Sequence, residues 1–344
     1  MRRSTPQQFQ RETNIALVLR ALRDEGPSSR SDLAARIGID RSTMTSIAAD
    51  LLRVGLLQET VGSHPGGRGG RRPVLLDLDG TRVLAGGMEL GEQETTWSVC
   101  SLRGEVLASG RVRRRGAGDV RDWTEHAFDQ ALAGMSRWRD EAYPQSMLAG
   151  VGVGVPGVVD PSTRTLRDSV VLGARDLPLG SIWEHASAGR GARGDSVPLL
   201  VDNDANCCAW NVAEEEPELT TIVVQLNLHR RHGGGLRDSL AGIGLSFVLD
   251  GRVYYGSSHA AGELRGYRWR VGNPDQLGLV ATSGRGGPGL EEVTGELLRN
   301  LGVIASVLDP GRLILAGEIA GHETMVRRQL QGDLATSSLA PLYE

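Results

Sequence analysis

The segment SRSDLAARIGIDRSTMTSIAADLLRVGLL, residues 29–57, has the pattern of a helix-turn-helix. Gly38 permits a tight turn between two short helices, and Asp40 can cap the second of them. Apolar residues recur at helical spacing on one face of each helix. They are Leu33 and Ile37 in the first helix, and Met44, Ile47 and Leu51 in the second.

The second of these helices begins with polar residues that its apolar face leaves exposed. In a helix-turn-helix, this end of the recognition helix meets base edges and phosphates in the major groove. We therefore expect it to bind DNA, although an ordinary solvated helix face can hold the same residue types. The residues concerned are Arg41, Ser42, Thr43, Thr45 and Ser46.

The flanking segments complete a winged helix. Residues 11–24 have the periodicity of an amphipathic helix. Residues 56–78, LLQETVGSHPGGRGGRRPVLLDL, predict two strands joined by a glycine-rich tip. Arg68, Arg71 and Arg72 in this tip can contact phosphates or the minor groove. The glycine content alone also permits a flexible linker between domains.

Charge is distributed unevenly along the chain. Residues 1–73 contain 12 Arg against 7 Asp and Glu, which gives +5, and the remainder contains 26 against 35, which gives −9. A basic segment attached to an acidic body is typical of a nucleic-acid-binding module fused to another domain.

Length and cysteine content indicate the class of protein. A chain of 344 residues predicts two or three domains, and no apolar run approaches the 18 or so residues of a membrane span. The N-terminus has no apolar stretch after its first arginines, and the three cysteines, Cys100, Cys207 and Cys208, lack ligand spacing. We therefore expect a cytoplasmic protein without disulfides or membrane contact.

From residue 83 the chain alternates strands with glycine turns. VLAGGMEL, TTWSVCSL and EVLASGRV predict a meander, followed by a helix over 122–138 and a buried strand in LAGVGVGVP. TTIVVQLNL, AGIGLSFVLDG and RVYYG, a helix over 289–308 and RLILAGE repeat this order. We therefore expect an α/β fold in which a winged helix-turn-helix precedes a two-lobed, actin-like or sugar-kinase-like domain (ASKHA, RNase H-like). The expected boundaries are 1–80 for the winged helix-turn-helix and 81–344 for the kinase-like domain, with lobes at 81–200 and 201–344.

Four segments, in this order, resemble the ROK family of repressors, open reading frames and sugar kinases. They are GVGVPGVVD (152–160), VDNDANCCAWNVAE (201–214), GIGLSFVLDGRVYYGSSHAAGE (242–263) and VLDPGRLILAG (307–317). The resemblance covers nearly the whole chain and implies a sugar or sugar-phosphate ligand. It places Asp204 at the catalytic base, where the helix dipole would keep its pKa low, and Glu263 at a sugar-binding position. We expect Asn203, Asp204 and Glu263 to bind an effector; helix capping is the alternative for Asp204.

The phosphate loop departs from the family's pattern. The family motif Asp-x-Gly-Gly-Thr corresponds here to ELGEQE, with Glu89, Glu92 and Gln93 in place of Asp, Gly and Thr, followed by Glu94. A carboxylate about 5 Å from a phosphate charge costs about 3 kcal/mol at an effective dielectric constant of about 20. ATP is therefore expected to bind poorly, and Asp204 would be a vestigial base without a catalytic role.

Zinc-binding and sugar-binding positions are also replaced. Gly266 takes the place of the family's zinc-binding His, and residues 264–290 contain neither Cys nor His. Val170 or Val171 falls at the position of a sugar-binding Asn. We therefore expect no metal and no cofactor, and a bound sugar would lose one hydrogen-bonding partner.

These observations favour a DNA-binding transcriptional regulator, more specifically a repressor, whose inactive kinase-like domain senses a carbohydrate-like effector. Its partners would be double-stranded operator DNA, a sugar-like small molecule, and further copies of itself in a homodimer or homotetramer. Two alternatives stay open: an active sugar kinase with a DNA-binding head, and a regulator that responds to a non-sugar ligand or a protein partner.

Replacing Arg68, Arg71 and Arg72 together by Ala is expected to weaken binding to all duplexes. Each phosphate contact that is lost removes about one counterion from the salt dependence, so the slope should decrease by up to about three phosphate equivalents. Affinity measured across a salt series checks this. An unchanged slope in the triple variant would show that the tip makes no phosphate contacts.

Overall fold

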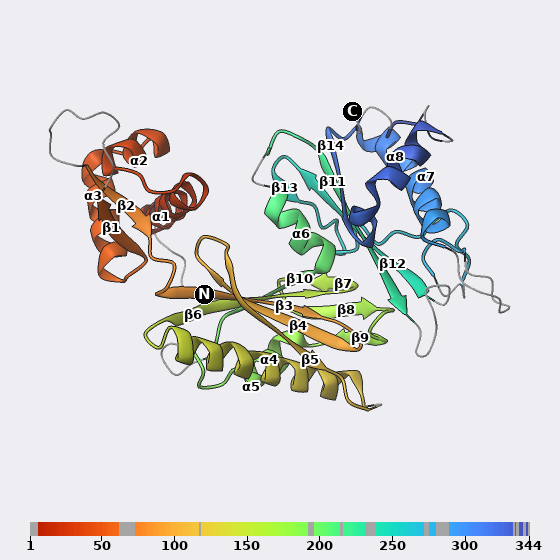
Figure 1. Ribbon diagram of the computed structural model, residues 1–344, viewed down its shortest axis with the longest axis horizontal. Helices are drawn as coiled ribbons and strands as arrows, with labels where there is room; N and C mark the ends of the chain where they lie inside the picture. The colour runs from red at the N-terminus through yellow and green to blue at the C-terminus, as the bar shows by residue number, and fades with distance from the viewer. Residues whose placement is uncertain are drawn as a thin grey trace.

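The chain forms a helical N-terminal part and two α/β lobes (Figure 1). The computed structural model describes residues 6–61, 73–116, 118–191, 196–213, 216–230, 239–271, 275–279 and 289–332, together with residues 334, 337–339 and 342. Within these ranges, none of the helices is both long and apolar enough to cross a bilayer. We call the described part of residues 6–78 the head, and the described residues from 83 onward the body.

The head has the element order expected for a winged helix-turn-helix. It contains α1 (Pro6–Glu25), α2 (Arg30–Ile37), α3 (Arg41–Arg53), β1 (Leu57–Val61) and β2 (Val74–Leu78). Gly38 ends α2 in the left-handed conformation, with φ of 73°. Asp40 caps α3 by accepting hydrogen bonds from the backbone N–H groups of Ser42 and Thr43, both at 2.9 Å. The predicted turn and cap are therefore confirmed.

One apolar cluster holds the head together. It includes Val18 and Leu22 of α1, Leu33 of α2, Met44, Ile47 and Leu51 of α3, and Leu57, Leu76 and Leu78 of the strands, all buried. β1 and β2 pair antiparallel from Leu57 opposite Leu78 to Val61 opposite Val74. Residues 62–72 therefore connect two paired strands, and the chain passes from head to body at residues 79–82. Arg68, Arg71 and Arg72 lie outside the described residues.

The first lobe is built on a five-stranded sheet. Its elements are β3 (Val83–Leu90), β4 (Glu94–Ser101), β5 (Val106–Arg113), α4 (Val120–Ala142), β6 (Met147–Val155), α5 (Leu179–Ala186) and β10 (Leu199–Asn203). The strand order is β10-β6-β3-β4-β5, in which β3, β4 and β5 form an antiparallel meander and β6 and β10 run parallel to β3. The predicted meander is confirmed, whereas α4 extends beyond the predicted helix at both ends.

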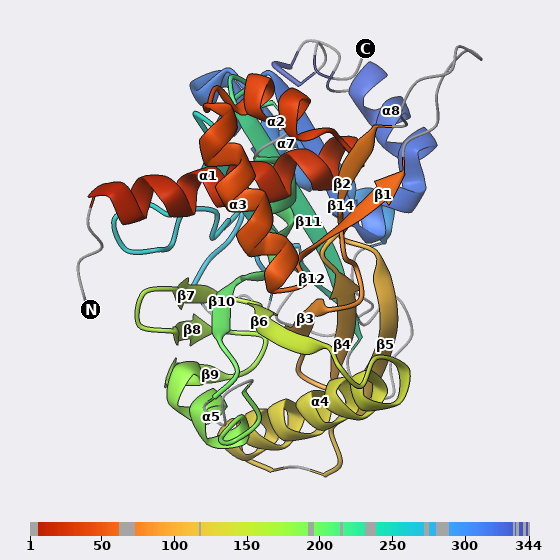
Figure 2. The ribbon, with the colours of Figure 1, turned by 90° about the vertical axis from the view of Figure 1, so that its left-hand side faces the viewer.

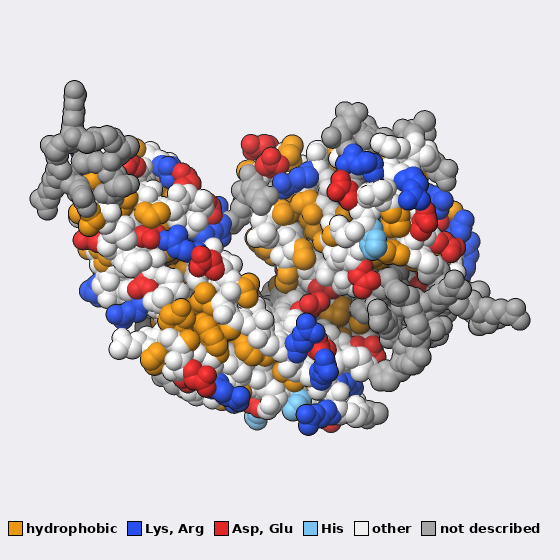
Figure 3. Space-filling model, in the orientation of Figure 1, with side chains coloured by type: hydrophobic (Ala, Val, Ile, Leu, Met, Phe, Trp, Pro, Cys, Tyr) orange, Lys and Arg blue, Asp and Glu red, His pale blue; other side chains and the backbone are white. Residues whose placement is uncertain are grey.

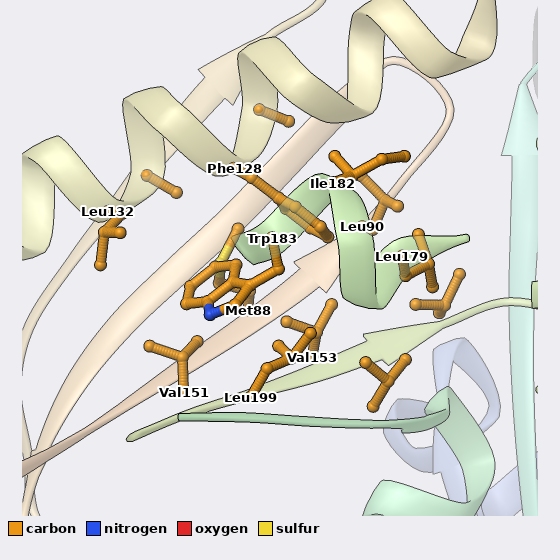
Figure 4. Packing of buried hydrophobic residues seen from close by; sticks show 14 of the residues in the cluster. Met88, Leu90, Phe128, Leu132, Val151, Val153, Leu179, Ile182, Trp183 and Leu199 are labelled. Carbon is orange, nitrogen blue, oxygen red and sulfur yellow. The ribbon is translucent and has the colours of Figure 1, made fainter. Parts of the chain in front are cut away.

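Two helices cover one face of this sheet (Figures 1 and 2). Trp183 of α5 meets Phe128 of α4 edge-on, with ring centroids 5.3 Å apart, and both side chains are fully buried against the sheet (Figure 4). The indole N–H of Trp183 donates to the carbonyl of Val197 at 2.7 Å, so burial leaves its polar atom satisfied. A second small sheet, β7 (Val158–Asp160), β8 (Thr165–Ser169) and β9 (Ala174–Leu177), was not predicted.

The second lobe repeats the meander and the parallel strand. It follows α6 (Asp204–Val212), which connects the lobes, and contains β11 (Thr221–Arg230), β12 (Ser239–Leu249), β13 (Arg252–Val253), α7 (Leu290–Leu308), β14 (Arg312–Gly317), η2 (Glu318–His322) and α8 (Glu323–Gln331). The strand order is β13-β12-β11-β14, with β14 parallel to β11. Two lobes with this shared topology confirm the expected RNase H-like fold, and α6 lies between their sheets (Figure 1).

Candidate functional site

The exposed end of α3 is partly occupied by its own hydrogen bonds. The hydroxyls of Ser42 and Thr43 both donate to Asp40. These hydrogen bonds hold the pKa of Asp40 well below its usual range, and the bond from Ser42 has the larger effect. The Thr45 hydroxyl donates to the Arg41 carbonyl at 2.8 Å. These three hydroxyls can still accept hydrogen bonds, but their donor capacity is used.

Arg41 differs from most arginines of the head. Five others form ion pairs within the head: Arg11 and Arg53 with Asp50, Arg23 with Asp24, Arg30 with Glu59, and Arg36 with Glu25. Across the described ranges, no hydrogen bond or ion pair engages the side chain of Arg41 or of Ser46, and both are exposed. Arg41 is therefore the predicted DNA contact whose charge is most available to a phosphate or a base.

In the body, the predicted effector residues lie where β10 ends and α6 begins. Asn203 caps α6: its side-chain oxygen accepts from the N–H groups of Ala205 at 2.9 Å and Asn206 at 3.3 Å. Its side-chain NH₂ donates to the Gly157 carbonyl at 2.9 Å. The capping role considered for Asp204 is therefore wrong, since Asn203 performs it. With its amide committed in this way, Asn203 has less to offer a ligand than the sequence suggested.

Asp204 is the first residue of α6 and lies between the lobes. The opposing strand β12 approaches closely at Gly244, where an added Cβ would be 2.8 Å from the Ala205 Cβ and 3.6 Å from a carboxylate oxygen of Asp204. Only glycine fits this approach without a shift of α6 or β12. The Asp204 carboxylate thus belongs to the first lobe through its strand and faces the second.

Burial, together with the smaller effect of the negative charge of Glu89, raises the pKa of Asp204 to about 6. The N–H of Ala205 donates to the carboxylate at 2.9 Å and opposes this shift. The expectation of a low pKa from the helix dipole is wrong, because desolvation and a neighbouring carboxylate outweigh the favourable backbone contact.

Glu263 shares this environment. Its side chain keeps solvent contact, yet the surrounding protein raises its pKa by desolvation, and the charges of Asp204 and Asp168 raise it further. Arg265 acts in the opposite direction. The structure therefore brings Asp204 and Glu263 together, as predicted, and adds Asp168 and Glu89 to one field of negative charge.

A buried network that the sequence analysis did not identify lies directly behind Asp204. One oxygen of Asp202 accepts from the Asn203 N–H and from the Asn206 side chain, at 2.8 and 2.9 Å. The other accepts from Trp210 at 3.1 Å and from the Tyr255 hydroxyl at 2.6 Å. The only signal in the sequence was a second aspartate, two residues before Asp204.

The position of the family's phosphate loop is a tight hairpin between β3 and β4. The Gly91 N–H donates to the Glu94 carbonyl at 3.1 Å, so only Glu92 and Gln93 form its tip. Glu94 is paired with Arg113 at 3.0 Å and with Arg111 at 3.3 Å. Glu94 therefore contributes less repulsion than expected, whereas Glu92 and Glu89 are exposed and in no ion pair of the described residues.

The remaining replaced positions give no ligand set for a metal. Val170 is 81% exposed in the turn between β8 and β9 and offers no hydrogen-bonding side chain. Nowhere in the described part of the chain do three or more His, Cys, Asp or Glu side chains form a group that could hold a metal ion.

Comparison with known proteins identifies a family model and several named relatives. Residues 85–266 match the family model described as ROK family. A putative xylose repressor of Caldicellulosiruptor sp. strain Rt8B.4 is 24% identical over 263 residues, which cover 74% of this chain and 58% of that protein. The chain spans 58% to 61% of the length of the first three xylose repressors that it matches.

Two solved structures share the fold. A ROK family transcriptional regulator, described as a homolog of E. coli MLC protein, has a TM-score of 0.68 at 21% identity, covering 97% of this chain and 90% of its own. A ROK family glucokinase from Streptomyces griseus, solved with glucose and AMPPNP, has a TM-score of 0.50 at 17% identity, covering 76% of this chain and 97% of its own.

The raised pKa of Asp204 predicts a pH dependence of stability. Its pKa is 3.8 unperturbed and about 6 in the folded chain, so the folded state retains the proton. Stability from this group is complete below about pH 4 and is lost as the pH rises through 6, by up to about 3 kcal/mol. Asp204→Asn should therefore stabilise the body at pH 7.5 and have little effect at pH 4.

Urea unfolding followed by tryptophan fluorescence at the two pH values measures this difference. Asp140→Asn is the control for removal of a carboxylate whose pair with Arg139 lies at the surface of α4. An Asp204→Asn variant that behaves like this control would contradict the raised pKa.

Proposed function

Because the chain belongs to the ROK family, we propose that it is a DNA-binding transcriptional regulator that acts as a repressor, and that its kinase-like body senses a ligand without catalysis. The observation that carries this proposal is the exposed start of α3, where Arg41 has no partner among the described residues while most neighbouring arginines are paired. A charge left available at the N-terminal end of a recognition helix is suited to contact phosphates and guanine. Relatives named as repressors support the same function.

The proposal includes an oligomer in the cytoplasm. A repressor of this type reads two half-sites with two heads, so a homodimer or homotetramer would fix their separation. Ligand binding between the lobes would change the angle of the lobes and hence the positions of the heads. Operator affinity would then depend on the ligand.

Loss of catalysis is supported by the hairpin at residues 91–94. A donor phosphate placed there would face Glu92 and Glu89, and the Gly91 N–H is already bonded to the Glu94 carbonyl. A sugar kinase with a DNA-binding head is the second candidate, favoured by one observation. The pKa of Asp204, raised to about 6, is near the value that suits a general base at neutral pH. ADP formation in the presence of a sugar panel separates the two, and turnover above background would overturn the inactive assignment.

Arg41→Ala is expected to weaken specific DNA binding by about 5-fold to 150-fold, since a base or phosphate contact of this kind contributes about 1 to 3 kcal/mol. Duplexes selected from a random pool by the wild-type protein provide the probe. Arg53→Ala is the matched control, because Arg53 ends the same helix and is paired with Asp50 at 2.8 Å. Absence of any enriched sequence would refute DNA recognition, and equal affinities of both variants would refute the role of Arg41.

A ligand bound beside Asp204 and Glu263 should be rich in hydrogen-bond donors. Asp204, Glu263 and Glu89 can accept hydrogen bonds from hydroxyls or amines and repel phosphate, whereas Asp168 is already paired with Arg175 at 3.2 Å. In titration calorimetry, a polyol, neutral sugar or amino sugar should therefore bind more tightly than any sugar phosphate. Asp204→Asn should weaken binding by about 10-fold to 150-fold through the loss of a charged acceptor. Tight binding of a sugar phosphate would contradict this proposed binding site. So would a ligand whose affinity is unchanged by Asp204→Asn.

A further inference from the structure

The turn between β4 and β5 of the body reaches into the head. We propose that this turn, residues 101–105, is a fixed joint that locks the head onto the first lobe, so that head and lobe move as one rigid unit. The consequence for operator binding rests on the function proposed above. The joint itself is a property of the fold and can be tested without DNA.

An apolar contact forms the first part of the joint. Leu102 packs against the hydrophobic cluster of the head and is itself partly buried. The other members of that cluster come from residues 15–78, so Leu102 is the body's contribution to the core of the head. Separating the two units would expose apolar surface of Leu102 and of the head cluster to water, which is unfavourable.

An ion pair forms the second part. The guanidinium of Arg103, next to Leu102, pairs with the Asp77 carboxylate on β2. The Asp77 side chain is 10% exposed and that of Arg103 is 27% exposed, so the pair is largely enclosed between the two units. Removing the Arg103 guanidinium while the head stays in place would leave the Asp77 carboxylate enclosed without its partner, which is strongly unfavourable.

The turn is held in shape by its own hydrogen bonds. The Ser101 N–H donates to the Glu105 carbonyl, and the Gly104 N–H donates to the Ser101 carbonyl, both at 3.0 Å. The Ser101 hydroxyl accepts from the Arg103 N–H at 3.2 Å. Leu102 and Arg103 are therefore presented from a closed turn and not from a loose loop.

The covalent connection between head and body is short and also fixed. Only residues 79–82 separate β2 from β3. Asp79 donates its N–H to the Leu56 carbonyl at 3.0 Å, and its carboxylate accepts from the Thr81 hydroxyl at 2.7 Å. The Arg82 carbonyl accepts from the Met147 N–H at 2.9 Å. One attachment would allow the head to swing, whereas two attachments side by side remove this freedom.

On its other side the head faces a hollow. Figure 3 shows a hollow between the head and the second lobe, with the first lobe as its floor. The orientation of the head therefore follows the first lobe. Strand β4 leads from the hairpin at residues 91–94 to the joint, a span of about 23 Å at the usual rise per residue.

Full-length Leu102→Ala, Arg103→Ala and the double variant test the joint. Arg113→Ala is the matched control, because Arg113 forms its carboxylate pair at the opposite end of the same two strands. In differential scanning calorimetry, the midpoint temperature at which the head unfolds should fall by roughly 5–15 °C in the double variant. The transition of the body should stay within about 2 °C of wild type, and the control should shift neither. An unchanged head transition would overturn the joint.

Small-angle X-ray scattering of the same proteins gives a second readout. The double variant should show a larger maximum dimension and the signature of independent units, whereas wild type and Arg113→Ala should scatter alike. If Leu102→Ala unfolds the head, Arg103→Ala removes no core side chain and still tests the link. The double variant Arg103→Ala with Asp77→Ala should recover part of the stability that Arg103→Ala alone loses, because no carboxylate is then left unpaired. Identical scattering from all variants would overturn the joint.

A DNA measurement separates this proposal from the proposed function. Duplexes selected by wild type and carrying two half-sites are lengthened between the half-sites by a few base pairs. Wild type should lose affinity at least 10-fold, and the double variant should lose less than 3-fold. Equal losses would overturn the joint's role in fixing the heads. Failure of wild type to bind any duplex would refute the DNA-binding function but leave the calorimetric and scattering tests intact.

Discussion

The carboxylate of Asp202 accepts four hydrogen bonds at the point where the two lobes meet. Two donors belong to the start of α6, while the Tyr255 hydroxyl reaches it from the second lobe. Asn206 extends the network by accepting from the Ser246 hydroxyl of β12 at 2.7 Å. A buried carboxylate with every acceptor position used is costly to disrupt. The network therefore ties α6 to the second lobe, directly behind Asp204.

Most of the fold could be predicted because its strands are long and patterned. VLAGGMEL matches β3 at both ends, and the apolar repeat over 289–308 matches α7 to within one residue. The small sheet β7–β9 escaped prediction because its strands have only three to five residues, and β8 reads Thr-Leu-Arg-Asp-Ser. Alternation cannot be recognised over so short a span. The start of α1 at Pro6, well before the predicted residue 11, is polar and thus had no periodic signal.

The candidate site was predictable in position but not in electrostatics. The family resemblance indicated Asp204 and Glu263, and at Asp204 the end of a strand followed by a helix can also be read from the chain. The sign of the pKa shift of Asp204 depends on desolvation and on Glu89, which lies 115 positions away in sequence. The neutralisation of Glu94 likewise depends on the register of β4 against β5, which brings Arg113 opposite it. Both effects depend on contacts between residues far apart in sequence, and no local sequence pattern encodes them.

The two ends of β4 are fixed by interactions of different strength. At the cleft end, Glu94 pairs with Arg111 and Arg113, whose side chains are 66% and 78% exposed, and exposed pairs of this kind contribute about 1 kcal/mol or less. At the head end, Leu102 shares an apolar core and Arg103 closes an enclosed pair. The joint is therefore the stronger of the two attachments of β4. Under the proposed function, a ligand-dependent rotation of the lobes would turn the whole first lobe together with its head, and in the proposed oligomer this would change the distance between two recognition helices without deforming either one.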